Sequence, residues 1–318
     1  MKDYGFTSAF APELNRYLAF KENMGFYGSS RIWYLKRFDR YCVEHGRDVF
    51  DQTTVEGWVA GQLQRSDRFR SWMSYIRDVG RWLVAEGNES AYVLSDQWRA
   101  PFVPARPYLL SRREIDAFFG AATVFRARSP WQWQAVAFFT LMHSCGMRTG
   151  EVRALLSEHV DLNHGHLDVV KSKGNRSRRL PLTEEVIEIL RSCDRISRQH
   201  VGPSRATFFV SGTNNQVTPS AVGVVFNRIW DRAGLARALQ GPRPRPYDFR
   251  HHFAYANVER WRRDGREVTA LLAYLSRYMG HATFESTYYY IHTSPDFMDA
   301  YAQIAQKSEE LLPEVGFE

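Results

Sequence analysis

The sequence predicts a mostly helical chain of two domains, the first all-α and the second α+β with a small β-hairpin or sheet. Three observations support this fold class. Apolar residues recur at helical spacing through most of the chain. A proline-rich stretch follows the first hundred residues, and the segment 167–182 combines two β-prone runs with a turn. At 318 residues, the chain is long enough for two domains.

The composition is that of a globular protein with a basic balance. The formal net charge is +7 and the pI is about 9.3, which favours a polyanionic partner. The first hundred residues carry +1 of this charge and the remainder carries +6. The N-terminus carries Lys2, Asp3 and Glu13 and has no apolar core of signal-peptide length, and the most apolar run, around Ala135 to Met142, is too short to span a bilayer. We therefore expect a soluble, cytoplasmic protein.

Neither the cysteines nor the histidines suggest a metal site. The three cysteines are too far apart for metal ligands, and any disulfide scheme leaves one unpaired: Cys42, Cys145 and Cys193. Reduced thiols in an intracellular protein are the simplest interpretation. Three histidines precede the predicted hairpin without a cysteine or paired carboxylate beside them: His159, His164 and His166. We expect no metal there.

Residues 1–100 are expected to form the helical N-terminal domain. It holds four amphipathic stretches: Ala9–Met24, Ser30–His45, Val55–Leu63 and Ser71–Glu86. Thr53 and Glu56 form a capping-box signature that opens the third stretch. Arginines occupy other faces of the second and fourth stretches, with Arg77 and Arg81 expected on an exposed face. These arginines form either a solvated surface or contacts to DNA phosphates, and the candidates are Arg31, Arg37, Arg40, Arg77 and Arg81.

A linker is predicted at residues 101–110, because three prolines between Ala100 and Tyr108 disfavour a helix. The second domain, residues 111–318, then opens with a capping box formed by Ser111 and Glu114. A long apolar helix follows from Trp131 to about Cys145 and ends at Gly146. Helices are also expected at Glu184–Arg198 and Pro219–Ala233, with a short apolar run at Thr207–Ser211 that suits a strand.

The segment from Gly146 to Glu151 suggests an anion-binding position. A helix that ends at Gly146 and restarts near Thr149 would place Arg148 at the start of the new helix. The helix dipole favours an anion at this point. Glu151 lies three residues further on, where its carboxylate can orient the guanidinium.

The hairpin predicted at residues 167–182 has a basic tip. A Lys-Gly-Asn turn separates its two β-prone runs, and the cations around it are Lys171, Lys173, Arg176 and Arg178. Charged residues are also common on the edges of ordinary hairpins. Candidate DNA contacts among these cations are Lys171, Arg176 and Arg178.

The last informative segment begins with Gly280 and His281, which follow a helix at Leu271–Met279, and continues to the tyrosines 288–290. A tyrosine cluster is usually an aromatic helix face buried in a core. A phenol is also a serviceable nucleophile when nearby cations stabilise its oxyanion. The cations elsewhere in the chain favour the second interpretation.

Taken in order, these segments resemble the four sequence boxes of the tyrosine recombinase (phage-integrase-like) family. The first box, G-[LM]-R-x-x-E, is matched by Gly146, Met147, Arg148 and Glu151. The hairpin box, K-G-x-x-x-R-x-x-P-L, is matched by Lys173, Gly174, Arg178, Pro181 and Leu182. The third box, H-x-x-R-H, has tyrosine in place of its first histidine: Tyr247, Arg250 and His251. The fourth joins Gly280 and His281 to Tyr290, nine residues later. The insertion before this box is similar to that of transposon-encoded members.

The resemblance implies a site-specific DNA recombinase that acts through a 3′-phosphotyrosine intermediate. Tyr290 would be the nucleophile, Lys173 the general acid, and two arginines the phosphate clamp: Arg148 and Arg250. His281 would hydrogen-bond the phosphate or assist in proton handling, Tyr247 would take the remaining donor position, and Glu151 would hold an arginine. No metal or nucleotide cofactor is implied. A type IB topoisomerase-like enzyme and a catalytically idle DNA-binding regulator remain alternatives.

The resemblance also implies an architecture and partners. Residues 1–100 would be a SAM-like core-binding domain, and residues 111–318 the catalytic domain with a C-terminal exchange helix. That helix, at Phe297–Leu312, would pack on a neighbouring protomer, although packing within its own chain stays open. The expected partners are double-stranded DNA with an inverted-repeat site and further copies of the chain, as a tetramer. The expected location is the cytoplasm, at the nucleoid.

Overall fold

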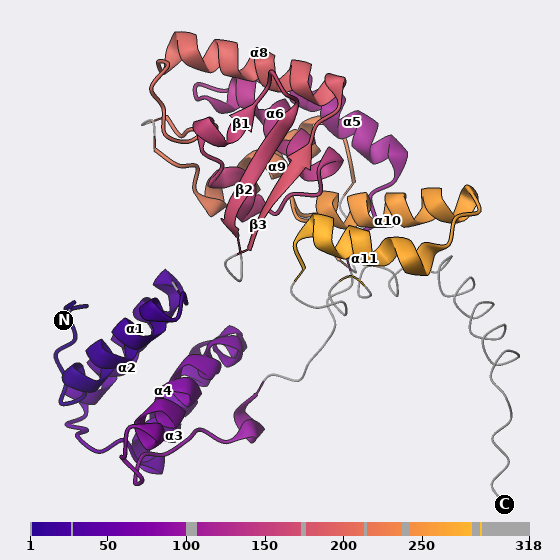
Figure 1. The fold of residues 1–318 in the computed structure, drawn as a ribbon. Coiled ribbons are helices and arrows are strands. Elements are labelled where there is room, and N and C mark those ends of the chain that lie inside the picture. The colour runs from indigo at the N-terminus through magenta and orange to yellow at the C-terminus, as the bar shows by residue number, and fades with distance from the viewer. Residues whose placement is uncertain are drawn as a thin grey trace, which may run out of the picture. The chain divides into compact units, whose positions relative to one another are not determined.

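The computed structural model describes residues 2–26, 28–99, 107–172, 176–212, 215–236, 242–281 and 287. The chain divides into two compact units, Met1–Pro104 and Ala105–Glu318, called unit 1 and unit 2 here (Figure 1). Most of the predicted linker and all of the predicted C-terminal helix lie outside the described residues. Among the described helices, none is both long and apolar enough to cross a membrane.

Unit 1 is built from four helices and two short 3₁₀ turns. The helices are α1 (Ala11–Asn23), α2 (Ser29–Glu44), α3 (Gln52–Arg65) and α4 (Met73–Ala85), and the turns are Asp67–Trp72 and Asp96–Trp98. Aromatic rings fill the core between them. The buried Tyr34 ring lies 4.7 Å from the ring of Trp58 and 5.6 Å from that of Trp72, both edge-on. The predicted all-α first domain is therefore confirmed for the described part of unit 1.

The start of α3 differs from the prediction. Asp51 caps this helix, because its carboxylate accepts a hydrogen bond of 2.8 Å from the backbone N–H of Thr54. The predicted capping box of Thr53 and Glu56 is wrong. Glu56 instead accepts hydrogen bonds from the hydroxyl of Tyr92 and the indole N–H of Trp98. Asp51, two positions before Thr53, caps the helix instead, because aspartate is a strong N-cap residue.

The exposed position expected for Arg77 is also wrong, because this side chain is 5% exposed. Its Nε donates to the carbonyl of Leu94 at 2.7 Å, and its Nη2 donates to the carbonyl of Ser95 at 2.8 Å. The backbone after α4 packs closely on this helix and leaves carbonyl groups that need donors. Arg77 supplies them, and its guanidinium therefore has a structural role in unit 1.

The other candidate arginines of unit 1 differ in exposure. Arg40 and Arg81 are exposed. Arg31 is half-buried, with its guanidinium 5.2 Å from the ring of Tyr75. Arg37 donates twice to the side-chain carbonyl of Gln62, at 3.2 and 2.8 Å. Neighbours in unit 1 therefore hold Arg31 and Arg37, whereas Arg40 and Arg81 project into solvent.

Unit 2 combines helices with a small antiparallel sheet. Its helices are α5 (Arg112–Thr123), α6 (Trp131–Ser144), α7 (Thr149–Arg153), α8 (Glu184–His200), α9 (Pro219–Arg232), α10 (Asp248–Arg263) and α11 (Val268–Met279). The strands are β1 (Val160–Asp161), β2 (His166–Ser172) and β3 (Arg176–Pro181), in the order β1-β2-β3. The predicted α+β class with a small sheet is confirmed. The run at Thr207–Ser211 makes only isolated bridges among the described residues.

The core of unit 2 forms around α6, which packs against α5, α8 and α10 (Figure 1). The rings of Phe118, Phe139, Phe226 and Phe249 meet there at centroid distances of 5.1 to 6.0 Å. The predicted capping box of Ser111 and Glu114 is present at the start of α5. This packing fixes the end of α6 beside the first turns of α10.

Two histidines are stacked inside unit 2. The rings of His143 on α6 and His252 on α10 are 5.4 Å apart and nearly parallel, at 14°. Burial lowers the pKa of His143 to about 4, and the repulsion that would arise if both rings were protonated adds to this effect. Burial also lowers the pKa of His252. Both rings are therefore neutral near pH 7.

Helices α10 and α11 lie side by side (Figure 1) and share a small core of Ala254, Val258, Leu272, Leu275 and Met279. Helix α11 is capped at its C-terminus by Gly280, which has left-handed φ and ψ angles of 67° and 45°. Glycine adopts this conformation without steric cost. The end of α11 thereby comes next to the start of α10, where Arg250 lies.

The packing of α4 makes a testable prediction about Gly80. A Cβ added at this glycine would lie 2.4 Å from the carbonyl oxygen of Tyr92, in the backbone that follows the helix. We expect Gly80→Ala to lower the free energy of unfolding by about 1–3 kcal/mol, as overpacking does. Urea denaturation monitored by circular dichroism would measure it.

The matched control is Gly61→Ala on α3, where a Cβ would have no neighbour within 4 Å. There the better helix propensity of alanine should raise the free energy of unfolding by about 0.5–1 kcal/mol. Equal stability of the two variants would contradict the close packing of α4.

Candidate active site

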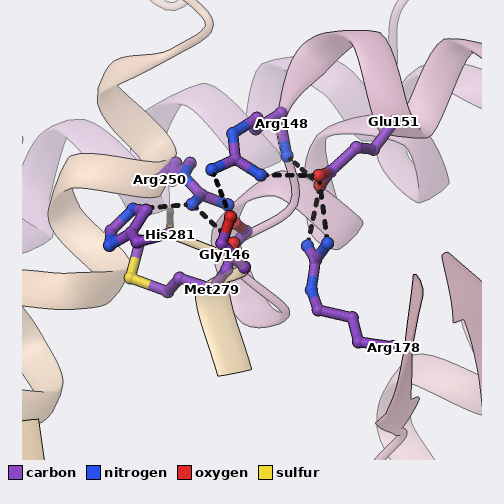
Figure 2. A network of polar contacts seen from close by, with 8 residues as sticks. Gly146, Arg148, Glu151, Arg178, Arg250, Met279 and His281 are labelled. Carbon is purple, nitrogen blue, oxygen red and sulfur yellow. Dashed lines mark hydrogen bonds and ion pairs between the residues drawn. The ribbon is translucent and has the colours of Figure 1, made fainter. Parts of the chain in front are cut away.

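The site lies where four segments of unit 2 meet, and Figure 2 shows their side chains converging. They are the turn before α7 with Gly146 and Arg148, the first turn of α10 with Arg250, the end of α11 with Met279 to His281, and β3 with Arg178. Each belongs to one of the boxes singled out in the sequence. The fold therefore brings together residues up to 135 positions apart.

Arg148 is the N-cap of α7, as the predicted helix break at Gly146 requires. Its Nη1 donates to Glu151 Oε1 at 2.8 Å, and its Nη2 donates to the carbonyl of Gly280 at 2.8 Å. Its backbone N–H donates to Glu151 Oε2 at 2.9 Å. Helix α7 has five residues, so its dipole is small. Charge at this position comes mainly from the guanidinium.

Gly146 has a structural reason to be glycine. Its φ angle is +60°, and an added Cβ would lie 2.5 Å from Cδ1 of Phe253 on α10. Its carbonyl accepts a hydrogen bond from Arg250 Nη1. The turn after α6 can therefore approach α10 closely enough to hold this arginine.

Arg250 is fully buried. Besides Gly146, its guanidinium contacts the end of α11: Nη2 donates to the carbonyl of Met279 at 2.8 Å and lies 2.9 Å from His281 Nε2 (Figure 2). A buried guanidinium is stable only when such acceptors replace water. The two arginines of the predicted clamp are thus held by consecutive carbonyls, those of Met279 and Gly280.

His281 is a neutral acceptor in this arrangement. A guanidinium can only donate, so Nε2 accepts from Arg250 and the ring proton is assigned to Nδ1. Nδ1 then donates to Thr287 Oγ1, at 2.7 Å. Burial lowers the pKa of His281 to about 3, and the charges of Arg250, Arg148 and Arg178 lower it further. The ring therefore orients an arginine and carries no charge at neutral pH.

Glu151 is the carboxylate at the centre of the site, with a side chain that is 5% exposed. Arg178 donates to it twice, from Nη1 to Oε1 at 3.0 Å and from Nη2 to Oε2 at 2.8 Å (Figure 2). Burial raises the pKa of Glu151, but the bonds and charge of Arg178 and the bonds from Arg148 outweigh it and lower the pKa to about 2. This carboxylate is ionised at physiological pH.

Tyr247 is the N-cap of α10 and is half-buried. Its ring meets that of His251 edge-on at 4.9 Å. Burial lowers the pKa of His251 to about 4, helped by the charges of Arg245 and Arg250. Tyr247 thus lies one helical turn from the buried arginine, on the same helix.

Several predicted site residues cannot be placed. Lys173 and Tyr290 lie outside the described residues, and so do the side chains of Lys171 and Arg176. In the described residues, no group of three side chains could hold a metal ion. Of the predicted site residues, the structure brings together Arg148, Glu151, Arg178, Arg250 and His281.

Sequence reasoning missed three features of the site. Thr287 could not be identified, because no local pattern marks a hydroxyl that will accept from a histidine. The carbonyls of Met279 and Gly280 leave no trace in the side chains either. Arg178 was expected to contact DNA, and its inward position could have been predicted, since it lies two positions before the apolar Leu180 on a strand and so shares its inward face.

Comparisons with known proteins place the chain in a family. Residues 110–296 match the phage integrase family. The candidate integrase/recombinase y4rB of Sinorhizobium fredii is 30% identical over 236 residues, which cover 71% of this chain and 74% of that protein.

Two solved structures share the fold. The Tn1549 transposon integrase in complex with transposon right end DNA has a TM-score of 0.60 at 14% identity, covering 94% of this chain and 100% of that one. A lambda integrase tetramer bound to a Holliday junction has a TM-score of 0.56 at 15% identity, covering 87% and 76%. With its four boxes in order and the family match over residues 110–296, the chain belongs to the phage integrase family of tyrosine recombinases.

Proposed function

We propose that this chain is a site-specific DNA recombinase that cleaves and rejoins strands through a 3′-phosphotyrosine intermediate. The observation that carries the proposal is the convergence of Arg148 and Arg250 on the end of α11. This end of the helix leads to His281, which precedes Tyr290 by nine residues in the sequence. Guanidinium groups can bind two oxygens of a phosphate at once. Their position supports a clamp for the phosphate that Tyr290 attacks.

In the proposed reaction, the phenolic oxygen of Tyr290 gives its proton to water and attacks the scissile phosphorus in line. A 3′-phosphotyrosine bond forms as the bond to the 5′-oxygen breaks. Lys173 gives its proton to that oxygen, which leaves as a 5′-hydroxyl. Rejoining reverses these steps, and the bond energy kept in the phosphotyrosine drives it. No metal or nucleotide takes part.

The arginines stabilise the negative charge that spreads over the non-bridging oxygens in the transition state. Arg148, whose side chain is 19% exposed, presents its guanidinium to the phosphate. Arg250 lies deeper and is oriented by His281. Glu151 holds Arg148, and Tyr247 supplies a hydroxyl donor where the family pattern has a histidine. A phenol can donate to a phosphate oxygen but carries no positive charge.

The partners in this proposal are double-stranded DNA with an inverted-repeat site and further copies of the chain. Unit 1 would act as a core-binding domain, with Arg40 and Arg81 exposed to the DNA backbone. The tetrameric lambda integrase of the same fold supports a tetramer, joined through the C-terminal helix at Phe297–Leu312. The similarity to a transposon integrase supports a role in moving a genetic element. Such an enzyme would act in the cytoplasm, at the nucleoid.

The test of this proposal is the covalent adduct. We expect the wild-type chain to form a protein–DNA adduct, resistant to denaturant, on nicked duplexes that carry the junctions of the genetic element encoding it. Tyr290→Phe should abolish the adduct and leave DNA binding intact, because only the nucleophilic oxygen is removed. Denaturing gel electrophoresis and a mobility-shift assay would measure the two properties. Tyr289→Phe is the control, and loss of the adduct in that variant alone would move the nucleophile by one position.

The phosphate clamp predicts a second result. Arg148→Ala and Arg250→Ala should each slow cleavage by about 10²–10³-fold, as removal of one oxyanion donor does. Arg250→Lys should also be slow, because a point charge cannot contact Gly146, Met279 and a phosphate together. Single-turnover cleavage rates would measure this. The control is Arg263→Lys, at an exposed position near the end of the same helix, and a near-native rate for Arg250→Lys would refute the clamp.

The general acid can be tested with sulfur. Replacing the bridging 5′-oxygen of the scissile phosphate with sulfur gives a leaving group that needs no proton. Lys173→Ala should therefore be severely slowed on normal DNA and largely restored on the 5′-thio substrate. Arg148→Ala should not be restored, since its charge acts on the non-bridging oxygens. An equal response of the two variants would exclude Lys173 as the acid.

A further inference from the structure

Arg178 faces the interior of unit 2, although it belongs to the basic tip of the hairpin. Its neighbours Ser177 and Arg179 are exposed, whereas Leu180 is fully buried on the same face of β3. The side chain of Arg178 is 10% exposed. Both terminal nitrogens of its guanidinium donate to Glu151, which makes it a poor candidate for the DNA contact expected from the sequence.

Arg178 and Arg148 share one carboxylate. Each oxygen of Glu151 accepts one bond from Arg178 and one from Arg148, and the four lengths lie between 2.8 and 3.0 Å (Figure 2). Parallel bonds between a guanidinium and a carboxylate fix direction as well as distance. Glu151 therefore links the hairpin to the turn that holds Arg148.

Arg178 is also packed against the end of α11. A Cβ added at Gly280 would lie 2.9 Å from Nη1 of Arg178 and 3.3 Å from its Cζ. The absence of a side chain at Gly280 thus lets the guanidinium reach Glu151. The carbonyl of the same glycine accepts from Arg148 Nη2 at 2.8 Å.

The hairpin is held at its base by apolar packing and further out by Arg178. Leu167 and Leu180 form a cross-strand pair that is fully buried in the core. Val169 and Arg178 form the next pair on this face, and after a register shift Ser172 pairs with Arg176. Lys173 comes directly after Ser172. The ion pair of Arg178 therefore acts on the part of the hairpin that leads to the lysine.

We propose that Arg178 is a positioning residue: by binding Glu151, it ties the hairpin that carries Lys173 to the carboxylate that orients Arg148. The ion pair then adds to the apolar packing that holds the strands leading to the general acid. This inference rests on the proposed function, in which Lys173 protonates the leaving oxygen. Without Arg178, Arg148 keeps its bonds to Glu151 and to Gly280, so the loss falls on the lysine.

The experiment compares cleavage rates on the all-oxygen and 5′-thio forms of the same nicked duplex. Arg178→Gln should slow cleavage of the all-oxygen DNA by about 10- to 100-fold, the usual effect of removing a group that orients a reacting residue. Most of this loss should disappear on the 5′-thio DNA, as for Lys173→Ala. The matched control is Arg179→Gln, whose side chain is 64% exposed and paired with Asp168. This variant should cleave both substrates at the wild-type rate.

A second measurement needs no DNA. Amide hydrogen exchange of the full chain should be faster in Arg178→Gln than in wild type at residues 169–178, with unchanged exchange in α6 and α8. Arg178→Lys keeps the charge without the paired bonds, so its exchange and cleavage should fall between those of wild type and Arg178→Gln. If Arg178→Gln does not fold, Arg178→Lys alone tests the inference. Its cleavage should be restored on the 5′-thio substrate, and its amide exchange should be faster in the hairpin.

Two results would overturn the inference. One is equal slowing of an Arg178 variant on both substrates, which would mean that the residue acts through the clamp or on the phosphate. The other is unchanged exchange in the hairpin, which would mean that the ion pair does not hold it. If the wild-type chain forms no adduct with DNA, the proposed function fails. The exchange measurement then still shows whether Arg178 holds the hairpin.

Discussion

The site depends on the burial of one guanidinium, that of Arg250. A buried cation without acceptors costs several kcal/mol or more, and the acceptors of Arg250 come from two separate places, Gly146 and Met279, with His281 beside them. The end of α6, the start of α10 and the end of α11 must therefore converge for unit 2 to be stable. The same convergence orients the arginines, so stability and site geometry have a common origin.

Charge in the site is arranged around Glu151. Arg148 and Arg178 bind a single buried carboxylate, and Arg250 lies beside His281, so positive charge is in excess next to the place proposed for a phosphate. The carboxylate binds two of the arginines and prevents them from repelling each other. Burial and the charges of the three arginines, which outweigh the opposing charge of Glu151, keep the ring of His281 unprotonated and available as an acceptor. Such a site is complementary to an anion before any substrate is present.

Local signals made part of this structure predictable from the sequence. The start of α5 at Ser111, the break at Gly146 and the hairpin each depend on a few neighbouring residues, and all three are found. The partners of arginines were not predictable, because packing of distant segments decides them. Arg77 binds carbonyls of its own unit, and Arg178 binds a carboxylate 27 positions away. A basic residue on a helix or strand carries no sign of which partner it will find.

The buried histidines have a consequence for acid stability. The pKa values of His143 and His251 are lowered to about 4, and that of His281 to about 3, from an ordinary value of 6.5. In the unfolded chain these rings bind protons below about pH 6.5, whereas in the folded chain they do not until about pH 3 to 4. Unfolding of unit 2 is therefore coupled to proton uptake throughout this window. Acidification favours the unfolded state well before Glu151, with a pKa of about 2, loses its charge.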